Sequence, residues 1–270
     1  MDVQLHGLYS QEHFSGWFVD FIHSRGIGDL TLKELRAQFI PILDSVLYHS
    51  KRQTSLKDTT QLKSFQKKLD LIKDELITQG LSNEFEMQVI KSLQSQVYLM
   101  LSRNGSSIRK GAQERDKQMA DNLSWLIANK LKGRKVIVWA ASSHIYKTSF
   151  EPVAKISPER FYPMGYYFTK QNTTLPVYIL GFTSYQGISK RVGHKSYSFE
   201  SREPNSFEEW VNSKGADFAF IDLEKVRTSV GKRQAFLMAG AGHIQTEQYW
   251  MEGFNGVFYI KKMEPCTLKE

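Results

Sequence analysis

The sequence predicts an α/β fold: a layered mixed sheet flanked by helices, with a helical insertion in the N-terminal half. Apolar residues recur at helical spacing through most of residues 10–103. From residue 112 onward, helical stretches alternate with short apolar runs. This alternation is typical of layered α/β domains. We therefore predict a single domain over residues 1–270, with the insertion at 28–110 and the α/β core at 111–270.

The helices are predicted from apolar stripes and their end signals. In residues 59–78, Leu62, Phe65, Leu69, Ile72 and Leu76 form one apolar stripe on an otherwise charged helix. Other helices are expected at residues 10–24, 31–49 (with Pro41 at a kink or break), 82–103, 112–131, 158–170 and 206–213. In the last of these, Ser206 is the expected N-cap and Glu209 is its reciprocal partner.

The strands are predicted from short apolar runs. Residues 135–140 contain an apolar run, Val-Ile-Val-Trp-Ala, that is too continuous for a strand with one face in water. We therefore predict a central strand here, covered on both faces. Further strands are expected at residues 177–183, 216–223 and 256–261.

Composition and charge limit the partners and the location of the protein. The net charge is +8, but the 36 basic residues are scattered among 28 acidic ones, and no nucleic-acid-binding motif accompanies them. No secretory signal opens the sequence, and no run of apolar residues is long enough to cross a bilayer. We expect a soluble, cytoplasmic protein that binds a small molecule and neither nucleic acid nor membrane.

Polar residues on the 112–131 helix form the first part of a candidate site. Arg115, Met119, Asn122 and Leu126 share one stripe that should face the core. A buried polar group without partners costs about 1 to 3 kcal/mol, so Arg115 and Asn122 should meet specific partners. These partners are either a ligand or the neighbouring strand. Asp116 lies one step round and is expected to face a neighbouring loop.

His144 forms the second part, directly after the predicted central strand. Three small residues, Ala141, Ser142 and Ser143, precede it and let a ligand approach closely. Ligands of α/β sheets collect at the carboxyl ends of strands, and an imidazole there acts as base, acid or hydrogen-bond donor. A structural role for His144 is the alternative. Without a Gly-x-Ser-x-Gly elbow, a phosphate-binding loop or a tight spacing of metal ligands, we predict no serine nucleophile, no cofactor and no metal.

These stretches resemble the erythromycin esterase family. The resemblance rests on Glu114-Arg-Asp-Lys-Gln-Met-Ala-Asp-Asn, on the block from Lys135 to Ile145, on Met164-Gly165 with residues 177–187, and on the closing Gly253-Phe-Asn-Gly-Val-Phe-Tyr-Ile. It implies an ester or lactone hydrolase, acting for example on macrolide antibiotics. It also implies that His144 and Arg115 serve catalysis, while Asp116, Asn122, Ser142 and Ser143 bind the substrate.

The sequence departs from the family pattern at two points. The family carries an upstream Gly-Glu-x-x-His-Gly motif whose histidine activates water, and this sequence holds no equivalent. After the strand, the family pattern reads Trp-Ala-His-Asn-x-His. In this sequence Ala141 and Ser142 replace the first histidine and the asparagine, and of the two histidines only His144 is retained. We therefore expect an N-terminally incomplete family domain with little turnover. The alternatives are a non-catalytic relative that binds a polyketide or carbohydrate and, more remotely, an anion-binding surface.

Overall fold

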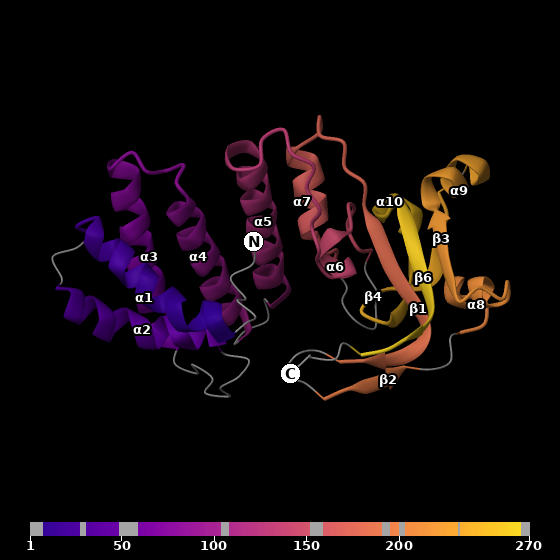
Figure 1. Cartoon of the computed structure of the whole chain (residues 1–270), viewed down its shortest axis with the longest axis horizontal. Coiled ribbons are helices and arrows are strands. Elements are labelled where there is room, and N and C mark those ends of the chain that lie inside the picture. Colours follow the sequence, from indigo (N-terminus) through magenta and orange to yellow (C-terminus); the bar gives the residue numbers. More distant parts are fainter. Residues whose placement is uncertain are drawn as a thin grey trace. The chain divides into compact units, whose positions relative to one another are not determined.

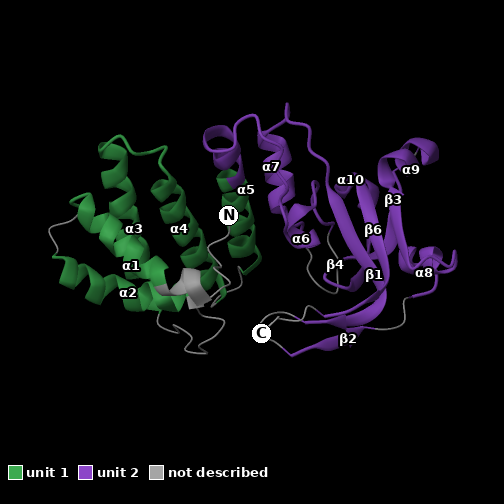
Figure 2. Cartoon of the chain, in the orientation of Figure 1, with its two compact units in different colours: residues 1–122 green, residues 123–270 purple. Residues whose placement is uncertain are grey.

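The computed structural model describes residues 8–27, 31–48, 59–103, 108–151, 159–190, 195–199, 203–231 and 233–265. The chain divides into two compact units, Met1–Asn122 and Leu123–Glu270, coloured green and purple in Figure 2. Helix α5 (Ile108–Asn129) runs through the boundary between them. The predicted single family domain with an insertion at residues 28–110 stays a prediction.

The first unit is helical, as the sequence predicts. Besides the first part of α5, its helices are α1 (Leu8–Ser24), α2 (Leu32–Tyr48), α3 (Thr59–Thr78) and α4 (Phe85–Arg103). The predicted stripe of α3 is confirmed, because all five of its apolar residues are buried. Pro41 lies inside α2, which continues through it. The apolar faces of α1 to α4 form one core.

The second unit carries a mixed sheet with the strand order β2-β1-β6-β3 (Figure 1). Its strands are β1 (Leu180–Ser189), β2 (Tyr197–Phe199), β3 (Phe218–Asp222) and β6 (Gly256–Met263). β1 runs parallel to β6, while β2 and β3 are antiparallel to their neighbours. β4 (Phe236–Ala241) and β5 (Ile244–Gln248) form a separate antiparallel pair. A mixed sheet with helices confirms the predicted fold class.

Short helices complete the second unit. They are α6 (Ser142–Ile145), α7 (Met164–Gln171), α8 (Phe207–Asn212), α9 (Leu223–Val230) and α10 (Trp250–Gly253). The predicted cap of α8 is present, since the backbone N–H of Glu209 donates to the side chain of Ser206 over 3.2 Å. β4 and α8 pack on one face of the sheet. The strands β2, β4 and β5 were not predicted from the sequence.

The predicted central strand at residues 135–140 is wrong. The structure assigns no strand there, and Ile137 is 92% and Trp139 87% exposed. A strand with both faces covered needs a layer on each side and neighbours along its edges. In the described part of the second unit this segment has neither, although the ring of Trp139 contacts Phe182 of β1 at 5.7 Å.

None of the described helices is both long and apolar enough to cross a membrane.

Candidate functional site

A polar pocket of about 480 Å³ lies in the second unit, within the range of small-molecule sites. Its walls come from the segment after α6, from α7, and from the residues around α10. The lining residues are Lys147, Thr148, Ser149, Glu151, Arg160, Tyr162, Tyr166, Thr169, Lys170, Thr173, Arg233, Tyr249 and Glu252. Hydroxyl groups, charges and aromatic rings thus face the same space, which suits a polar ligand with ring structures.

Tyr146 fixes the segment that forms the first wall. Its hydroxyl donates to the backbone oxygen of Tyr249 over 2.9 Å. Its ring stacks on Phe150 at 4.4 Å and meets Phe254 edge-on at 5.1 Å. Burial raises the pKa of Tyr146 well above its usual range, so the side chain stays neutral. This anchor holds Lys147 and the residues after it at the pocket.

Two glycines permit the close packing behind the pocket. A Cβ on Gly253 of α10 would lie 1.6 Å from the ring of Tyr146. A Cβ on Gly165, in the first turn of α7, would lie 2.1 Å from the backbone oxygen of Ile145. Only glycine lets the α10 and α7 backbones approach the segment after α6 this closely. The positions of both helices, and hence the pocket shape, depend on these contacts.

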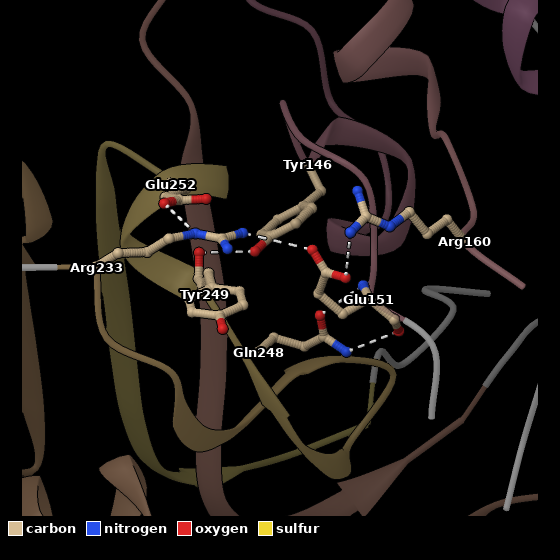
Figure 3. Close-up of polar contacts among 7 residues, drawn as sticks. All are labelled: Tyr146, Glu151, Arg160, Arg233, Gln248, Tyr249 and Glu252. Atoms are coloured by element: carbon tan, nitrogen blue, oxygen red, sulfur yellow. Dashed lines mark hydrogen bonds and ion pairs between the residues drawn. The ribbon is translucent and has the colours of Figure 1, made fainter. Parts of the chain in front are cut away.

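A chain of ion pairs runs along the pocket (Figure 3). Arg160 lies 3.1 Å from Glu151, and Arg233 lies 3.4 Å from the other oxygen of Glu151. Arg233 also pairs with Glu252 at 2.8 Å. Its guanidinium lies over the ring of Tyr249, 3.5 Å from the centroid. The hydrogen bond with Glu252 raises the pKa of Arg233, which remains charged. Cations and carboxylates therefore alternate in one fixed row.

Gln248 holds the backbone of Glu151 in place. The N–H of Glu151 donates to the side-chain oxygen of Gln248 over 2.9 Å, and the Gln248 amide donates back to the Glu151 carbonyl over 3.2 Å (Figure 3). Gln248 is itself buried at the end of β5. The carboxylate of Glu151 is thus presented to both arginines from a fixed backbone.

The pocket has more positive than negative groups. Lys147, Arg160, Lys170 and Arg233 face Glu151 and Glu252, an excess of two cations. Lys147 is half-buried, and this burial, together with the charge of Arg227, lowers its pKa against the opposing effect of Glu224. Positive charge on half-buried groups stabilises a negatively charged partner more strongly than it would in bulk water.

The predicted residues of the second unit lie on α6, just before this pocket. Ser142, Ser143 and His144 share its single turn and are half-buried. The N–H of His144 donates to the carbonyl of Ala141 over 2.8 Å. The hydroxyl of Ser142 lies 3.5 Å from the backbone nitrogen of Phe182. The structure therefore brings these three together, and the pocket lining begins at Lys147.

The predicted residues of the first unit lie on α5. Arg115 is half-buried, while Asp116 and Asn122 are buried. The sequence predicts that Asp116 faces a neighbouring loop, whereas in the structure Asp116 is fully buried. The amide of Asn122 donates to the Ser92 hydroxyl over 2.8 Å and accepts from Gln118 over 2.9 Å. Asn122 thus ties α5 to α4. Whether this group and His144 share one site stays a prediction.

The pocket residues themselves were missed by sequence analysis. Glu151, Arg160, Arg233 and Glu252 are isolated charged residues with no common spacing. The available signals were Met164-Gly165 and Gly253, which belong to the recognisable blocks and mark the close approach of α7 and α10. Within the described residues, no group of three histidine, cysteine or carboxylate side chains is placed to hold a metal ion.

Most of the chain is similar to known proteins. A family model described as erythromycin esterase matches residues 32–263. An Escherichia coli erythromycin esterase type II is 27% identical over an alignment of 159 residues, and the match covers 55% of this chain and 36% of that protein. The chain thus matches little more than a third of the length of that relative.

Two solved structures share the fold. A Bacillus cereus protein superposes with a TM-score of 0.67 at 15% identity, covering 100% of this chain and 67% of that one. A succinoglycan biosynthesis protein superposes with a TM-score of 0.63 at 16% identity, covering 99% of this chain and 65% of that one. Each solved chain therefore carries about a third of its length beyond the shared part.

Proposed function

Because residues 32–263 match its model, this chain belongs to the erythromycin esterase family, and on that premise we propose that it is a hydrolase in which water attacks an ester or lactone carbonyl of a small molecule such as a macrolide. Family membership is the observation that carries the proposal. The relative from Escherichia coli is named for the same reaction.

The charge of the pocket supports this chemistry. Attack of water on a carbonyl places negative charge on its oxygen, and hydrolysis then leaves a carboxylate. A pocket with two more cations than carboxylates stabilises both species. Tyr162 and Tyr166, whose rings lie 4.7 Å apart, offer aromatic surface to the ring atoms of a substrate.

The proposed roles of the α6 and α5 residues follow the family resemblance. His144 donates a hydrogen bond to the carbonyl oxygen or transfers a proton, and Arg115 stabilises the developing charge. Ser142 and Ser143 bind the substrate beside His144. On the same resemblance, Asp116 and Asn122 of α5 are proposed as substrate-binding residues.

A non-catalytic relative is the second candidate. The observation that favours it is Ala141, which stands where the family has a histidine, together with the absence of a Gly-Glu-x-x-His-Gly motif from these residues. A base that activates water contributes about 100-fold to 10,000-fold, so residues 1–270 should turn over slowly under either reading. In this second role the pocket would bind a polyketide or a carbohydrate.

Incubation of the purified chain with erythromycin and with p-nitrophenyl butyrate tests the proposal. Mass spectrometry of the products should show slow addition of one water to the ester or lactone. Binding is followed in parallel by calorimetry, using Tyr166→Ala as the pocket variant and Tyr98→Ala, an exposed tyrosine of α4, as the control. Binding without hydrolysis would select the non-catalytic relative. If erythromycin neither binds nor reacts and the butyrate is stable, both readings fail.

A further inference from the structure

A second cavity of the second unit lies beside the polar pocket. Its volume is about 370 Å³, which is enough for a small ligand. Its walls come from the C-terminal half of α9, the segment that follows α9, and α10. The lining residues are Arg227, Thr228, Gly231, Arg233, Gln234, Met251 and Glu252. Arg233 and Glu252 also line the polar pocket, so the two cavities share a wall. We call the second one the α9 cavity.

The shared wall of the α9 cavity carries no excess of negative charge. Glu252 is the carboxylate among the described lining residues, and it pairs with Arg233 at 2.8 Å. Arg233 reaches Glu151 of the polar pocket with another nitrogen, at 3.4 Å. The negative charge of Glu252 is therefore neutralised within the wall, which leaves the positive charge of Arg227 uncompensated in the cavity.

Arg227 and Gln234 offer hydrogen-bond donors to this space. Arg227 lies in the last turn of α9, and its carbonyl accepts from the backbone N–H of Gly231 over 3.1 Å, which fixes the backbone there. Among the described residues, neither the Arg227 nor the Gln234 side chain has a hydrogen-bond or ion-pair partner. The planar fork of a guanidinium matches two oxygens of a carboxylate or a phosphate.

A second cation, Lys147, is tied to the end of α10. Its backbone N–H donates to the carbonyl of Gly253 over 3.1 Å. Burial and then the charge of Arg227 lower the pKa of Lys147, while Glu224, whose carboxylate accepts from the Asn255 amide, has the opposite effect. The two cations therefore repel each other. Like charges held near one another in this way are typical of sites that receive an opposite charge.

We propose that the α9 cavity binds a small organic oxyanion, a carboxylate or a phosphate, through the guanidinium of Arg227 and the amide of Gln234. The carbon part of the ligand contacts the buried, apolar side chain of Met251. The C-terminal end of a helix carries a partial negative charge of about half a unit, which the full charge of Arg227 outweighs. Carboxylates and phosphates share this recognition, because both present two oxygens to the same fork.

Titration calorimetry of the purified chain at low salt tests the proposal, with phenyl phosphate and benzoate as probes and benzyl alcohol as their neutral counterpart. We expect the anions to bind and benzyl alcohol not to bind. Tighter binding of phenyl phosphate would assign the cavity to phosphates, and tighter binding of benzoate would assign it to carboxylates. If neither anion binds, or if benzyl alcohol binds as tightly, the proposal is wrong.

Variants of α9 locate the bound anion. Arg227→Gln should lower the affinity for both anions by about tenfold or more, because it removes charged hydrogen bonds. Arg227→Lys keeps the charge without the fork and should be intermediate. Since Arg227 is exposed, both variants should keep the thermal midpoint of the wild type. The matched control is Lys225→Gln, on the same helix but outside the lining and paired with Asp222 at 3.8 Å. Equal losses in Arg227→Gln and Lys225→Gln would show that only the general charge of the surface attracts the anions.

A further variant separates the α9 cavity from the polar pocket. Lys170 lines the polar pocket and not the α9 cavity, so Lys170→Gln should leave the affinity for phenyl phosphate and benzoate unchanged. A larger loss in Lys170→Gln than in Arg227→Gln would place the anion in the polar pocket and overturn the proposal. These measurements need no turnover, so their outcome does not depend on the proposed hydrolase activity.

Discussion

Arg233 lies over the ring of Tyr249, with its guanidinium carbon 3.5 Å from the ring centroid, and its nitrogens pair with Glu252 and with Glu151. The arginine thereby joins Glu151 and Glu252, the two carboxylates that line the pocket. A lysine at the same position has the charge but neither the planar surface nor the fork of donors.

Arg233→Ala should lower both the urea midpoint of the second unit and the affinity for a pocket ligand. Removal of the guanidinium leaves Glu252 without its 2.8 Å partner and weakens the row that holds Glu151. Arg233→Lys should be intermediate in both measurements. The control is Arg36→Ala, which removes an exposed pair with Asp20 in the first unit. Equal effects of Arg233→Ala and Arg36→Ala would show that the row has no special role.

Gly253→Ala should destabilise the second unit by about 2 kcal/mol, because a new methyl group overlaps the buried ring of Tyr146. That ring is packed by Phe150 and Phe254 and has no space to move. Gly16→Ala, inside α1, is the opposite control, since nothing lies within 4 Å of its added Cβ. It should stabilise its helix by about 1 kcal/mol. Scanning calorimetry of both variants measures whether each one lowers or raises the thermal stability. An unchanged stability in Gly253→Ala would contradict the packing of α10.

Tyr259→Phe should stabilise the protein, by about 1 kcal/mol at neutral pH. The Tyr259 hydroxyl is buried and makes no hydrogen bond with the described residues, and burying such a group without a partner is unfavourable. Tyr146→Phe is the matched comparison and should cost about 1 kcal/mol, because its hydroxyl bonds to the Tyr249 carbonyl. Urea unfolding gives both values. The same sign for the two variants would be inconsistent with these environments.

The same tyrosine predicts a loss of stability in alkali. Burial, followed by the charges of Tyr185 and Glu208, raises the pKa of Tyr259 to about 12 from 10.0. The unfolded chain therefore loses this proton first, so the free energy of unfolding is independent of this group below pH 10 and falls as the pH rises toward 12. Tyr259→Phe should unfold less steeply between pH 10 and 12 than the wild type. Parallel pH profiles of the two would contradict the raised pKa.

Asn122→Ala should cost about 1 to 3 kcal/mol, because it removes the amide that joins Ser92 and Gln118 inside the first unit. The variant also tests the predicted substrate role of this residue. If Asn122 is only structural, KM for an ester should change no more than it does for Ser92→Ala. A larger rise in KM for Asn122→Ala would support contact with the substrate.

The fold class and most elements could be predicted because they depend on local patterns. The α3 stripe has a helical period, and the Ser206 cap of α8 is a local hydrogen-bond motif. Strands β3 and β6 were found because their apolar runs are short and bounded. The hairpin of β4 and β5 was missed, because neither strand shows a clear alternation of apolar and polar residues.

The candidate site was harder to predict because its residues are distant in sequence. Glu151 meets Arg233 only through the packing of α10 against the segment after α6, and no local spacing signals this contact. The error at residues 135–140 has a different origin. Their composition is typical of a buried strand, but burial also requires a covering layer, and composition alone does not show whether one is present.

The most direct test of the account is the rate of ester hydrolysis by His144→Ala, compared with the wild type and with His13→Ala, an exposed histidine of α1. The slow release of p-nitrophenol from p-nitrophenyl butyrate gives kcat/KM for the wild type and both variants. Hydrolysis of erythromycin is measured for the same three proteins. The account predicts that His144→Ala loses about 100-fold or more while His13→Ala retains the wild-type value. Hydrolysis that survives unchanged in His144→Ala would contradict the assignment of this histidine to the site.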